Sequence, residues 1–175
     1  PLHFIATMPP SVPGVRVQTL LRKYFANLGG VYMLGNRVTG GCIEDGRLRY
    51  VETSLLPDER LEASDFVLAT GSFTSDGLKS NYECVYEPIF HLDVTAPADR
   101  MQWVSTSVFD DQPYLHYGVR VNALQQVQKE GHTISNLYAA GAVLGGHNAA
   151  RLADGAGVDM VTALRVAQCI LDNNH

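Results

Sequence analysis

Apolar and polar positions near the start of the chain alternate with a helical period. From residue 17 onward the apolar side chains follow the i, i+3, i+4, i+7 rule, and the polar residues between them fall on the other face. This spacing predicts an amphipathic helix that starts near Pro13 and ends at Gly29-Gly30, because glycine readily adopts the left-handed conformation that closes a helix. Residues 31–34 then read as a short strand. The apolar positions of the helix are Leu20, Leu21, Tyr24 and Leu28.

The middle of the chain shows the patterns of strands. Residues 37–44 and 47–53 flank Asp45-Gly46, a pair that favours a tight hairpin turn, so we expect a β-meander to begin here. Residues 65–71 form a continuous apolar run that ends in a turn, which is typical of a strand buried on both faces of a parallel sheet. Residues 136–141 repeat this pattern and predict a second buried strand.

The remaining segments are an irregular stretch and a final helix. Residues 72–118 are rich in aromatic residues and proline, and we assign them to a cap or substrate-side insertion. After residue 154 a helix is predicted, and its narrow polar stripe indicates that it is mostly buried. The stripe consists of Asp159, Thr162, Arg165 and Gln168.

Composition narrows the classes of function. The 175 residues are 46% hydrophobic and 18% charged, which is enough apolar material for one globular unit over 1–175. The net charge of -5 leaves no basic face for nucleic acid, and no apolar stretch reaches the roughly 20 residues that cross a bilayer. The three cysteines are widely spaced, so we expect no metal site and a reducing, cytoplasmic compartment.

The most informative segment is the glycine-rich turn after the second buried strand. It runs over residues 137–148 and leads to Gly155 and Gly157 at the head of the last helix. Each glycine there costs about 1 kcal/mol relative to alanine, which suggests that something approaches the backbone closely. The free N–H groups and the helix dipole would stabilise a phosphate or the N1/O2 edge of a reduced flavin. The alternative is a turn that only packs helix on strand.

These residues carry a resemblance. Ala69-Thr70-Gly71 at the end of one buried strand, and residues 136–146 leading into a glycine-opened helix, resemble the second half of the two-dinucleotide-binding-domain flavoproteins, the group that contains fumarate reductase. The resemblance implies an α/β fold: the C-terminal part of a FAD/NAD(P)-binding Rossmann-like flavoprotein fold, with a β-meander and an irregular α+β insertion. Residues 1–71 and 119–175 would form the flavin-binding Rossmann-like part.

Further motifs narrow the resemblance to the family of the anaerobic glycerol-3-phosphate dehydrogenase B subunit, over nearly the whole chain. They occur at residues 9–14, 71–78, 87–94, 112–119 and 142–146. The strand-turn-helix with the G-x-G-x-x-G phosphate fingerprint is missing, so we expect this chain to be a C-terminal portion.

The resemblance implies a function. The parent protein would bind FMN or FAD and help to oxidise glycerol 3-phosphate to dihydroxyacetone phosphate under anaerobic conditions, passing electrons to a membrane quinone. Its partners would be a catalytic A subunit and an iron–sulfur membrane-anchor subunit. These partners would hold it at the inner face of the cytoplasmic membrane.

The resemblance also assigns residues. Thr70 and Gly71 would lie near the phosphate or ribityl region of the cofactor. The flavin would be lined by Gly141, Gly145 and Gly146. Backbone N–H groups would reach its pyrimidine edge from Gly155, Gly157 and Val158.

The sequence departs from the family around the last turn. The family continues after Gly-Gly with an aromatic-Asp-Pro and later has Cys-Gly, whereas this chain has His147-Asn148-Ala149 and Asp154-Gly155. Asp154 would cap the helix but repel an anionic reduced flavin. Arg151 keeps part of the Asn-Arg-Leu-Gly-Gly motif with which fumarate-reductase relatives hold an anionic substrate.

Two residues of this turn are candidate catalytic groups. Arg151 suits a phosphate or carboxylate through its fork of donors, the alternative being a surface salt bridge. His147 would donate a proton or hydrogen bond near the flavin, the alternative being a polar contact. His91 and His116 read as core histidines, and Asp110-Asp111 as carboxylates that point apart into solvent.

Two other functions stay open from the sequence. One is a self-sufficient fumarate-reductase-like FAD oxidoreductase, which would need a complete dicarboxylate-binding set of His and Arg. The other is a non-catalytic complex-assembly subunit with a decayed flavin site, which the changes at His147, Asn148 and Asp154 keep open.

Overall fold

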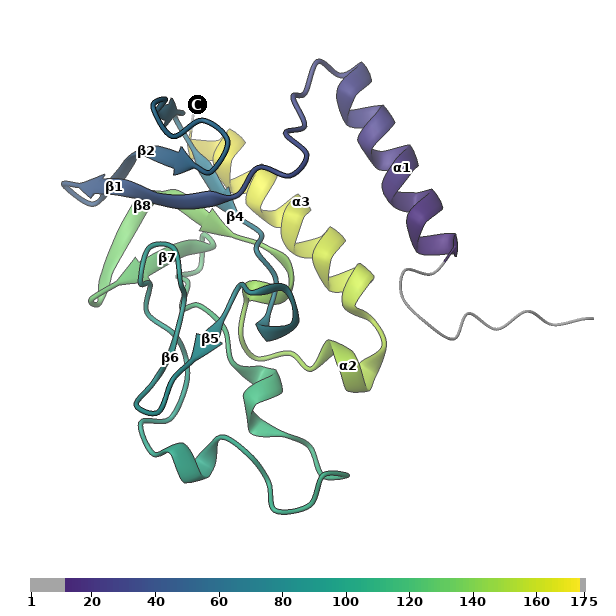
Figure 1. Ribbon diagram of the computed structural model, residues 1–175, viewed down its shortest axis with the longest axis vertical. Helices are drawn as coiled ribbons and strands as arrows, with labels where there is room; N and C mark the ends of the chain where they lie inside the picture. The colour runs from purple at the N-terminus through teal and green to yellow at the C-terminus, as the bar shows by residue number, and fades with distance from the viewer. Residues whose placement is uncertain (1–11, 174–175) are drawn as a thin grey trace, which may run out of the picture. The chain divides into compact units, whose positions relative to one another are not determined.

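The structure is a computed structural model that describes residues 12–173 (Figure 1). The chain forms two compact units that divide between Asn36 and Arg37. In the described residues, the first unit holds α1 (Val12–Asn27), and the second holds the strands and the other helices. Because each unit is compact by itself, the single globular unit expected over 1–175 stays a prediction.

The first unit confirms the predicted helix and contradicts the short strand after it. α1 ends at Asn27, and Gly29 follows with a φ of 86°, the left-handed conformation expected of a helix end. The strand predicted at residues 31–34 is wrong. Those residues form an extended stretch and a turn in which the N–H of Asn36 donates to the carbonyl of Met33 at 3.3 Å. A strand needs a hydrogen-bonding neighbour, and the sequence pattern alone does not supply one.

The second unit opens with an antiparallel sheet of β1 (Val38–Glu44), β2 (Arg47–Thr53) and β3 (Leu61–Glu62) in that order. The hairpin predicted around Asp45-Gly46 is confirmed, since β1 pairs with β2 directly across that turn. Both turn residues have positive φ, 51° and 69°, as a turn matching the strand twist requires.

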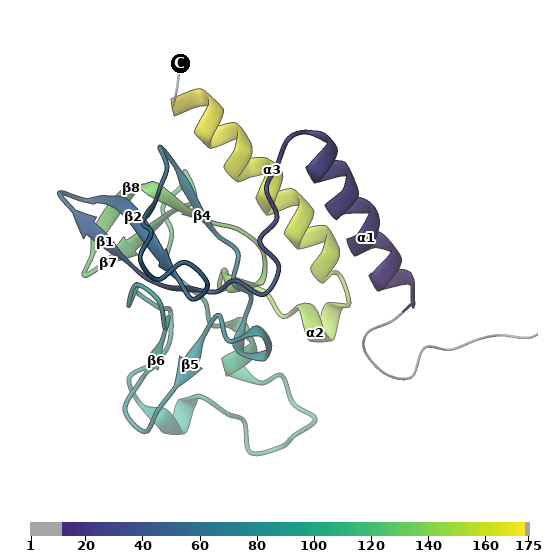
Figure 2. The same cartoon turned by 45° about the horizontal axis from the view of Figure 1, so that its top comes forward.

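A second sheet has the order β4-β8-β7 and joins segments far apart in the chain. β4 (Phe66–Leu68) runs parallel to β8 (His132–Ala139), and β7 (Gln126–Lys129) pairs antiparallel with the other edge of β8. The two predicted strands therefore exist and are parallel neighbours (Figures 1 and 2). The end of β8 is buried as expected, but Val67 in β4 is 49% exposed. The expectation that β4 is buried on both faces is wrong, because β4 is the edge strand of this sheet.

Residues 72–118 contain β5 (Lys79–Ser80), β6 (Val85–Tyr86) and the short 3₁₀ turns η1 (Phe73–Ser75), η2 (Arg100–Gln102) and η3 (Pro113–His116). Their large apolar side chains join the core formed by the two larger sheets. The segment is thus anchored by packing, although it has little regular structure. Its buried anchors are Leu78, Phe90, Leu92, Trp103 and Tyr117.

The chain closes with η4 (Gly141–Val143), α2 (Ala149–Leu152) and the long helix α3 (Gly155–Asn173). Val166 and Cys169 of α3 are buried against Tyr138 and Ala140 of the second sheet and the residue after it. The prediction of a mostly buried last helix is wrong, since only one of its faces meets the sheet of this unit. The large apolar residues left exposed are Met160, Val161, Leu164 and Leu171. None of the helices within residues 12–173 combines the length and apolarity needed to span a membrane.

Candidate functional site

The candidate site lies where two parallel strands end. β4 and β8 run in the same direction, and the N–H of Ala140 donates to the carbonyl of Leu68 at 3.0 Å, which extends the pairing beyond β8. Thr70-Gly71 and Gly141 therefore leave the sheet at the same edge. In open α/β sheets ligands bind at this edge, beyond the carboxyl ends of the strands.

Thr70 has an unusual hydroxyl. Its Oγ1 atom is buried and has no hydrogen-bond partner among the described residues. A buried polar atom left unpaired costs about 1–3 kcal/mol, so it is rare in folded proteins. An orphaned hydroxyl at the strand edge fits a site that is completed by a ligand with polar atoms, such as the ribityl or phosphate groups of a flavin.

Four of the predicted cofactor glycines are explained by packing alone. A Cβ atom at Gly71 would lie 2.7 Å from Ser75 Oγ, and one at Gly141 would lie 2.8 Å from Asp159 Oδ1; both glycines also have φ near 76°. A Cβ at Gly145 would lie 3.1 Å from Gly118 N, and one at Gly155 would lie 3.3 Å from Ala149 Cβ. At these positions the protein itself leaves no room for a side chain.

Gly146 and Gly157 differ from the other glycines of the turn. A Cβ at either position would meet no atom of the chain within 4 Å. Gly146 has a φ of 87°, which gives a conformational reason for glycine, but Gly157 lies in the first turn of α3 with no such requirement. Open space above a helical glycine fits the close approach of a ligand, and the chain offers no packing reason for it.

The N-terminus of α3 uses part of its donors internally. The N–H groups of Gly157 and Val158 donate to the carbonyl of Asp154, at 2.8 and 3.1 Å. The donors ahead of this pair in the first turn belong to Gly155 and Ala156, and helix geometry leaves them outside the intrahelical bonds. An anion at this helix end would meet those two donors first.

His147 and Asp154 form a pair beside that helix end. His147 Nε2 lies 2.7 Å from Asp154 Oδ1, and the two side chains are 27% and 49% exposed. Sequence reasoning considered Asp154 as a helix cap, but its carboxylate contacts the imidazole. The pairing fixes the orientation of the ring, as a carboxylate does for a general base.

Asp111 is the centre of a second polar cluster. Its carboxylate accepts from Asn148 Nδ2 at 2.7 Å and lies 2.8 Å from His116 Nε2, with Arg151 Nη1 at 3.9 Å. Hydrogen bonds from His116 and then Asn148 lower the pKa of Asp111. Asn148, which is buried, also caps α2 by accepting from the N–H of Arg151 at 3.1 Å. Arg151 itself is 63% exposed.

This cluster corrects two expectations. His116 was expected in the core but is exposed and paired with Asp111, and His91 is also exposed, stacked on Tyr86. Asp111 was expected to point into solvent, yet it joins the irregular segment to the turn that carries Arg151. No sequence signal marks Asp111, because Asn148 is 37 positions away and only the fold brings them together. In the described part of the chain, no group of three or more potential ligands could hold a metal ion.

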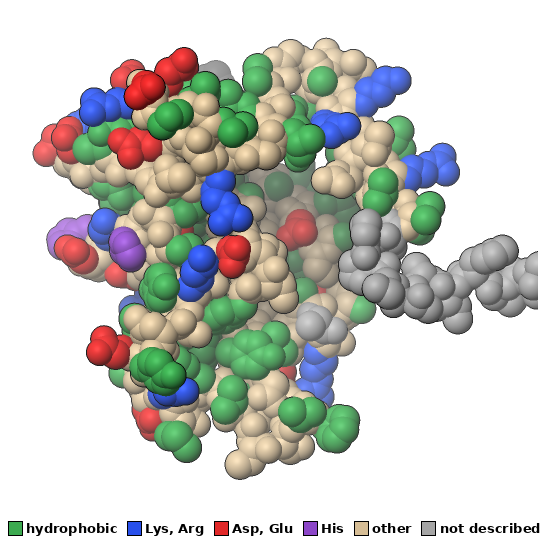
Figure 3. Space-filling model, in the orientation of Figure 1, with side chains coloured by type: hydrophobic (Ala, Val, Ile, Leu, Met, Phe, Trp, Pro, Cys, Tyr) green, Lys and Arg blue, Asp and Glu red, His purple; other side chains and the backbone are tan. Residues whose placement is uncertain are grey.

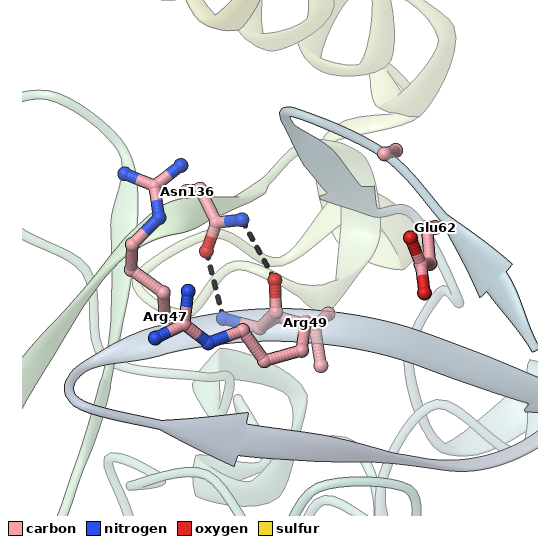
Figure 4. Close-up of a pocket in the computed structure, with 6 residues that line it drawn as sticks. Arg47, Arg49, Glu62 and Asn136 are labelled. Atoms are coloured by element: carbon pink, nitrogen blue, oxygen red, sulfur yellow. Dashed lines mark hydrogen bonds between the residues drawn. The ribbon is translucent and has the colours of Figure 1, made fainter.

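A surface pocket of about 460 Å³ lies elsewhere (Figure 4). Asn136 in its wall holds the backbone of Leu48, and the Arg47 and Arg49 side chains extend on the same side as the amide. Asn136 precedes Gly141 by five residues along β8, which corresponds to roughly 16 Å of extended chain. The pocket is therefore separate from the glycine-rich turn. Its lining consists of Arg47, Leu48, Arg49, Glu62, Ala63 and Asn136.

Comparison with known proteins agrees with this geometry. The anaerobic glycerol-3-phosphate dehydrogenase B subunit from Haemophilus influenzae (strain PittGG) is 43% identical over 175 residues, which cover 97% of this chain and 40% of that protein. The B subunit from Glaesserella parasuis serovar 5 (strain SH0165) is 40% identical over 172 residues, covering 95% of this chain and 40% of the relative. That from Actinobacillus succinogenes is 42% identical over 178 residues, covering 99% and 41%. The chain thus spans about 40% of the length of the curated relatives it matches, and no solved structure matches it.

A family model described as "FAD binding domain" matches residues 1–158. The match covers the ends of β4 and β8, the orphaned Thr70 hydroxyl and the first turn of α3, and its description names one of the two flavins expected from the sequence. It supports the expected flavoprotein fold, and the mixed α/β structure agrees with it. The chain belongs to the FAD binding domain family.

Proposed function

We propose that this chain is the flavin-holding part of a flavoprotein subunit in a quinone-linked dehydrogenase that oxidises glycerol 3-phosphate to dihydroxyacetone phosphate under anaerobic conditions. The observation that carries the proposal is the orphaned Thr70 Oγ1 at the edge where the open glycines Gly146 and Gly157 are predicted to line a flavin. The names of the relatives support the substrate and the partners, namely the catalytic A subunit and the iron–sulfur anchor subunit.

The cofactor contacts follow from the donors and the space of the turn. Thr70 Oγ1 donates to the ribityl or phosphate part, and Gly71 follows it at the same edge. Gly141, Gly145 and Gly146 line the ring, and Gly157 and Val158 give the first turn of α3 its bare surface. Gly155 offers a backbone N–H to the pyrimidine edge. When bound, the flavin supplies a two-electron acceptor for the carbon that bears the hydroxyl.

The polar side chains of the turn have separate tasks. Arg151 is exposed and only 3.9 Å from a carboxylate that two other groups already hold, so its guanidinium is available to the substrate phosphate. Asp154 engages Nε2 of His147 and orients the ring, which leaves Nδ1 to accept the proton of the substrate hydroxyl. Residues 72–118 then form the cap that shields these groups from water.

A second candidate is a complex-assembly subunit whose flavin site has decayed. It is favoured by the bonding at the head of α3, where the N–H groups of Gly157 and Val158 already donate to Asp154. Flavin content decides between the two functions.

The test is a titration with FAD and with FMN, followed by flavin fluorescence, on this chain and on the full-length protein. Gly157→Leu fills the open space above α3 and is expected to weaken flavin binding more than tenfold, a loss above about 1.4 kcal/mol. Ala167→Leu adds the same bulk at an exposed position of the same helix and should leave affinity unchanged. A full-length protein that binds neither flavin would refute the proposal and leave the assembly subunit in its place.

A further inference from the structure

The loop between η2 and η3 presents two large apolar side chains to solvent. Val108 is 82% exposed and Phe109 is 96% exposed, and Met101 near the start of the loop is 83% exposed. In Figure 3 hydrophobic side chains cover the tip of this loop at the lower edge of the molecule. Covering a valine or phenylalanine side chain is strongly favourable, so neighbouring ones left in water mark an interaction surface. We call Val108 and Phe109 the loop tip.

The loop that carries this tip is held in one shape. Gln112 Oε1 accepts from the N–H of Ser105 at 3.0 Å, while Gln112 Nε2 donates to the carbonyls of Ser107 and Asp110 at 2.8 and 3.2 Å. Trp103 anchors the start of the loop in the core, with Nε1 donating to the carbonyl of Pro97 at 2.8 Å. A preorganised loop loses little conformational entropy on binding, which favours its use as a docking element.

The base of the loop touches the candidate site. Ser105 Oγ donates to the carbonyl of Asp111 at 3.0 Å, and the Asp111 carboxylate is bound by His116 and Asn148 beside Arg151. Phe109 lies just ahead of Asp111, the residue that joins this segment to the candidate substrate-binding arginine. A protein seated on the tip would adjoin the site.

The charges around the tip select the kind of partner. Asp99, Asp110 and Asp111 surround the loop, with Arg100 as the basic residue among them. Three carboxylates against one guanidinium repel an anionic lipid surface and favour a protein surface with a basic rim. An apolar centre with a polar or charged rim is the usual composition of a protein interface.

We propose that the loop tip docks into an apolar pocket with a basic rim on a partner subunit of the dehydrogenase. This proposal rests on the proposed function, which supplies the partner. Two other occupants are outcomes of the test: the part of the full-length protein that lies outside this chain, and a lipid surface.

The first experiment is oxidative footprinting of Met101 and Phe109 by mass spectrometry, on the isolated full-length subunit and on the assembled complex. Both residues are expected to react readily in the isolated subunit and to be protected in the complex. Protection already present in the isolated subunit would show that its own chain covers the tip and would overturn the proposal. Equal reactivity in both states would also overturn it.

The second experiment compares the affinity of full-length variants for the partner. Phe109→Asp is expected to weaken association about thirtyfold, as loss of an aromatic anchor does. Leu124→Asp, an exposed leucine outside the loop, is the matched control and should bind like wild type. Because Phe109 has almost no contact with the core, its replacement leaves folding intact. Unchanged affinity of Phe109→Asp, or binding to anionic vesicles that this variant loses, would overturn the proposal.

The two proposals can fail separately. If the Phe109→Asp variant still assembles while the full-length protein binds flavin, docking through the tip is refuted and the flavin function stands. If the tip is protected in a complex that contains no flavin in this subunit, the docking stands and the flavin function is refuted.

Discussion

At the scale of single residues, the candidate site is defined by polar groups whose partners are missing or unexpected. Thr70 and Thr162 illustrate the contrast. Thr70 Oγ1 is buried without a partner among the described residues, whereas Thr162 Oγ1 accepts from the N–H of Gly141 at 2.8 Å and donates to the carbonyl of Val158 at 2.7 Å. One hydroxyl is available for a ligand, and the other holds the end of β8 to α3.

Replacement of each threonine by valine, which has the same shape, should therefore have opposite effects. Thr70→Val is expected to leave the free energy of unfolding of the ligand-free chain unchanged or slightly higher, because it removes an unpaired buried hydroxyl. It should weaken FAD binding by about 1 kcal/mol, or roughly fivefold. Thr162→Val should lower stability by about 1–2 kcal/mol. Urea unfolding and a FAD titration check both, and equal destabilisation by the two changes would contradict the assignment.

Asp111 gives a prediction on acid stability. Hydrogen bonds from His116 and Asn148 lower its pKa from the ordinary value of 3.8, so the folded state favours the carboxylate. The stabilisation is fully present above pH 3.8 and is lost as the pH falls below that value through the lower folded pKa. The unfolding free energy of wild type should thus exceed that of Asp111→Asn at pH 7, and the difference should shrink below pH 3.8.

The control for this experiment is Asp110→Asn, which changes the same charge at the neighbouring position. It should follow the pH dependence of wild type in urea unfolding. A difference between wild type and Asp111→Asn that stays constant down to pH 2, about two units below the reference value, would show that the carboxylate contributes through packing and not through its charge.

At the scale of elements, α3 distinguishes what periodicity predicts from what packing decides. Val166 is 2% exposed and Val161 is 66% exposed, although both lie among the apolar positions of the same helix. Val166→Ala should lower the free energy of unfolding by roughly 2 kcal/mol through lost burial and a cavity. Val161→Ala should change it by less than about 0.5 kcal/mol. Thermal or urea unfolding of this chain checks the pair, and equal costs would restore the mostly buried helix that the sequence pattern predicts.

The elements that the sequence predicts well are those whose signals are local. The hairpin depends on Asp45-Gly46, the helix end on Gly29, and the parallel strands on two apolar runs, and all are present. The sequence also marks the glycines of the turn, but it does not tell Gly141, which has Asp159 above it, from Gly157, which has open space. That distinction depends on which atoms the fold brings near.

Long-range contacts explain the rest of what the sequence misses. Asp111 belongs to the site because the chain returns Asn148 to it, and the loop tip is exposed because Gln112 closes the loop behind it. Such contacts join polar residues without any periodic spacing. The resemblance to a flavoprotein family predicts the region of the cofactor, whereas these side-chain partners follow only from the fold.

At the scale of the second unit, Asn136 joins the two larger sheets. Its Oδ1 accepts from the N–H of Leu48 in β2 at 2.8 Å, and its Nδ2 donates to the carbonyls of Leu48 and Ser64 at 2.8 and 3.1 Å. The side chain is 2% exposed, so these bonds are made where water cannot replace them. One amide thus connects the hairpin sheet, β8 and the segment that leads into β4.

Asn136→Ala is therefore expected to destabilise the chain by roughly 3 kcal/mol, because it leaves the buried N–H and carbonyl of Leu48 without partners. Ser135→Ala is the matched control: the neighbouring side chain is exposed and makes one bond, to the carbonyl of Gly46 at 3.2 Å, so its loss should cost less than about 1 kcal/mol. Urea unfolding measures both. Because Asn136 also lines the pocket of Figure 4, the result decides its role: equal stability of the two variants would mean that the amide serves that pocket and not the junction of the sheets.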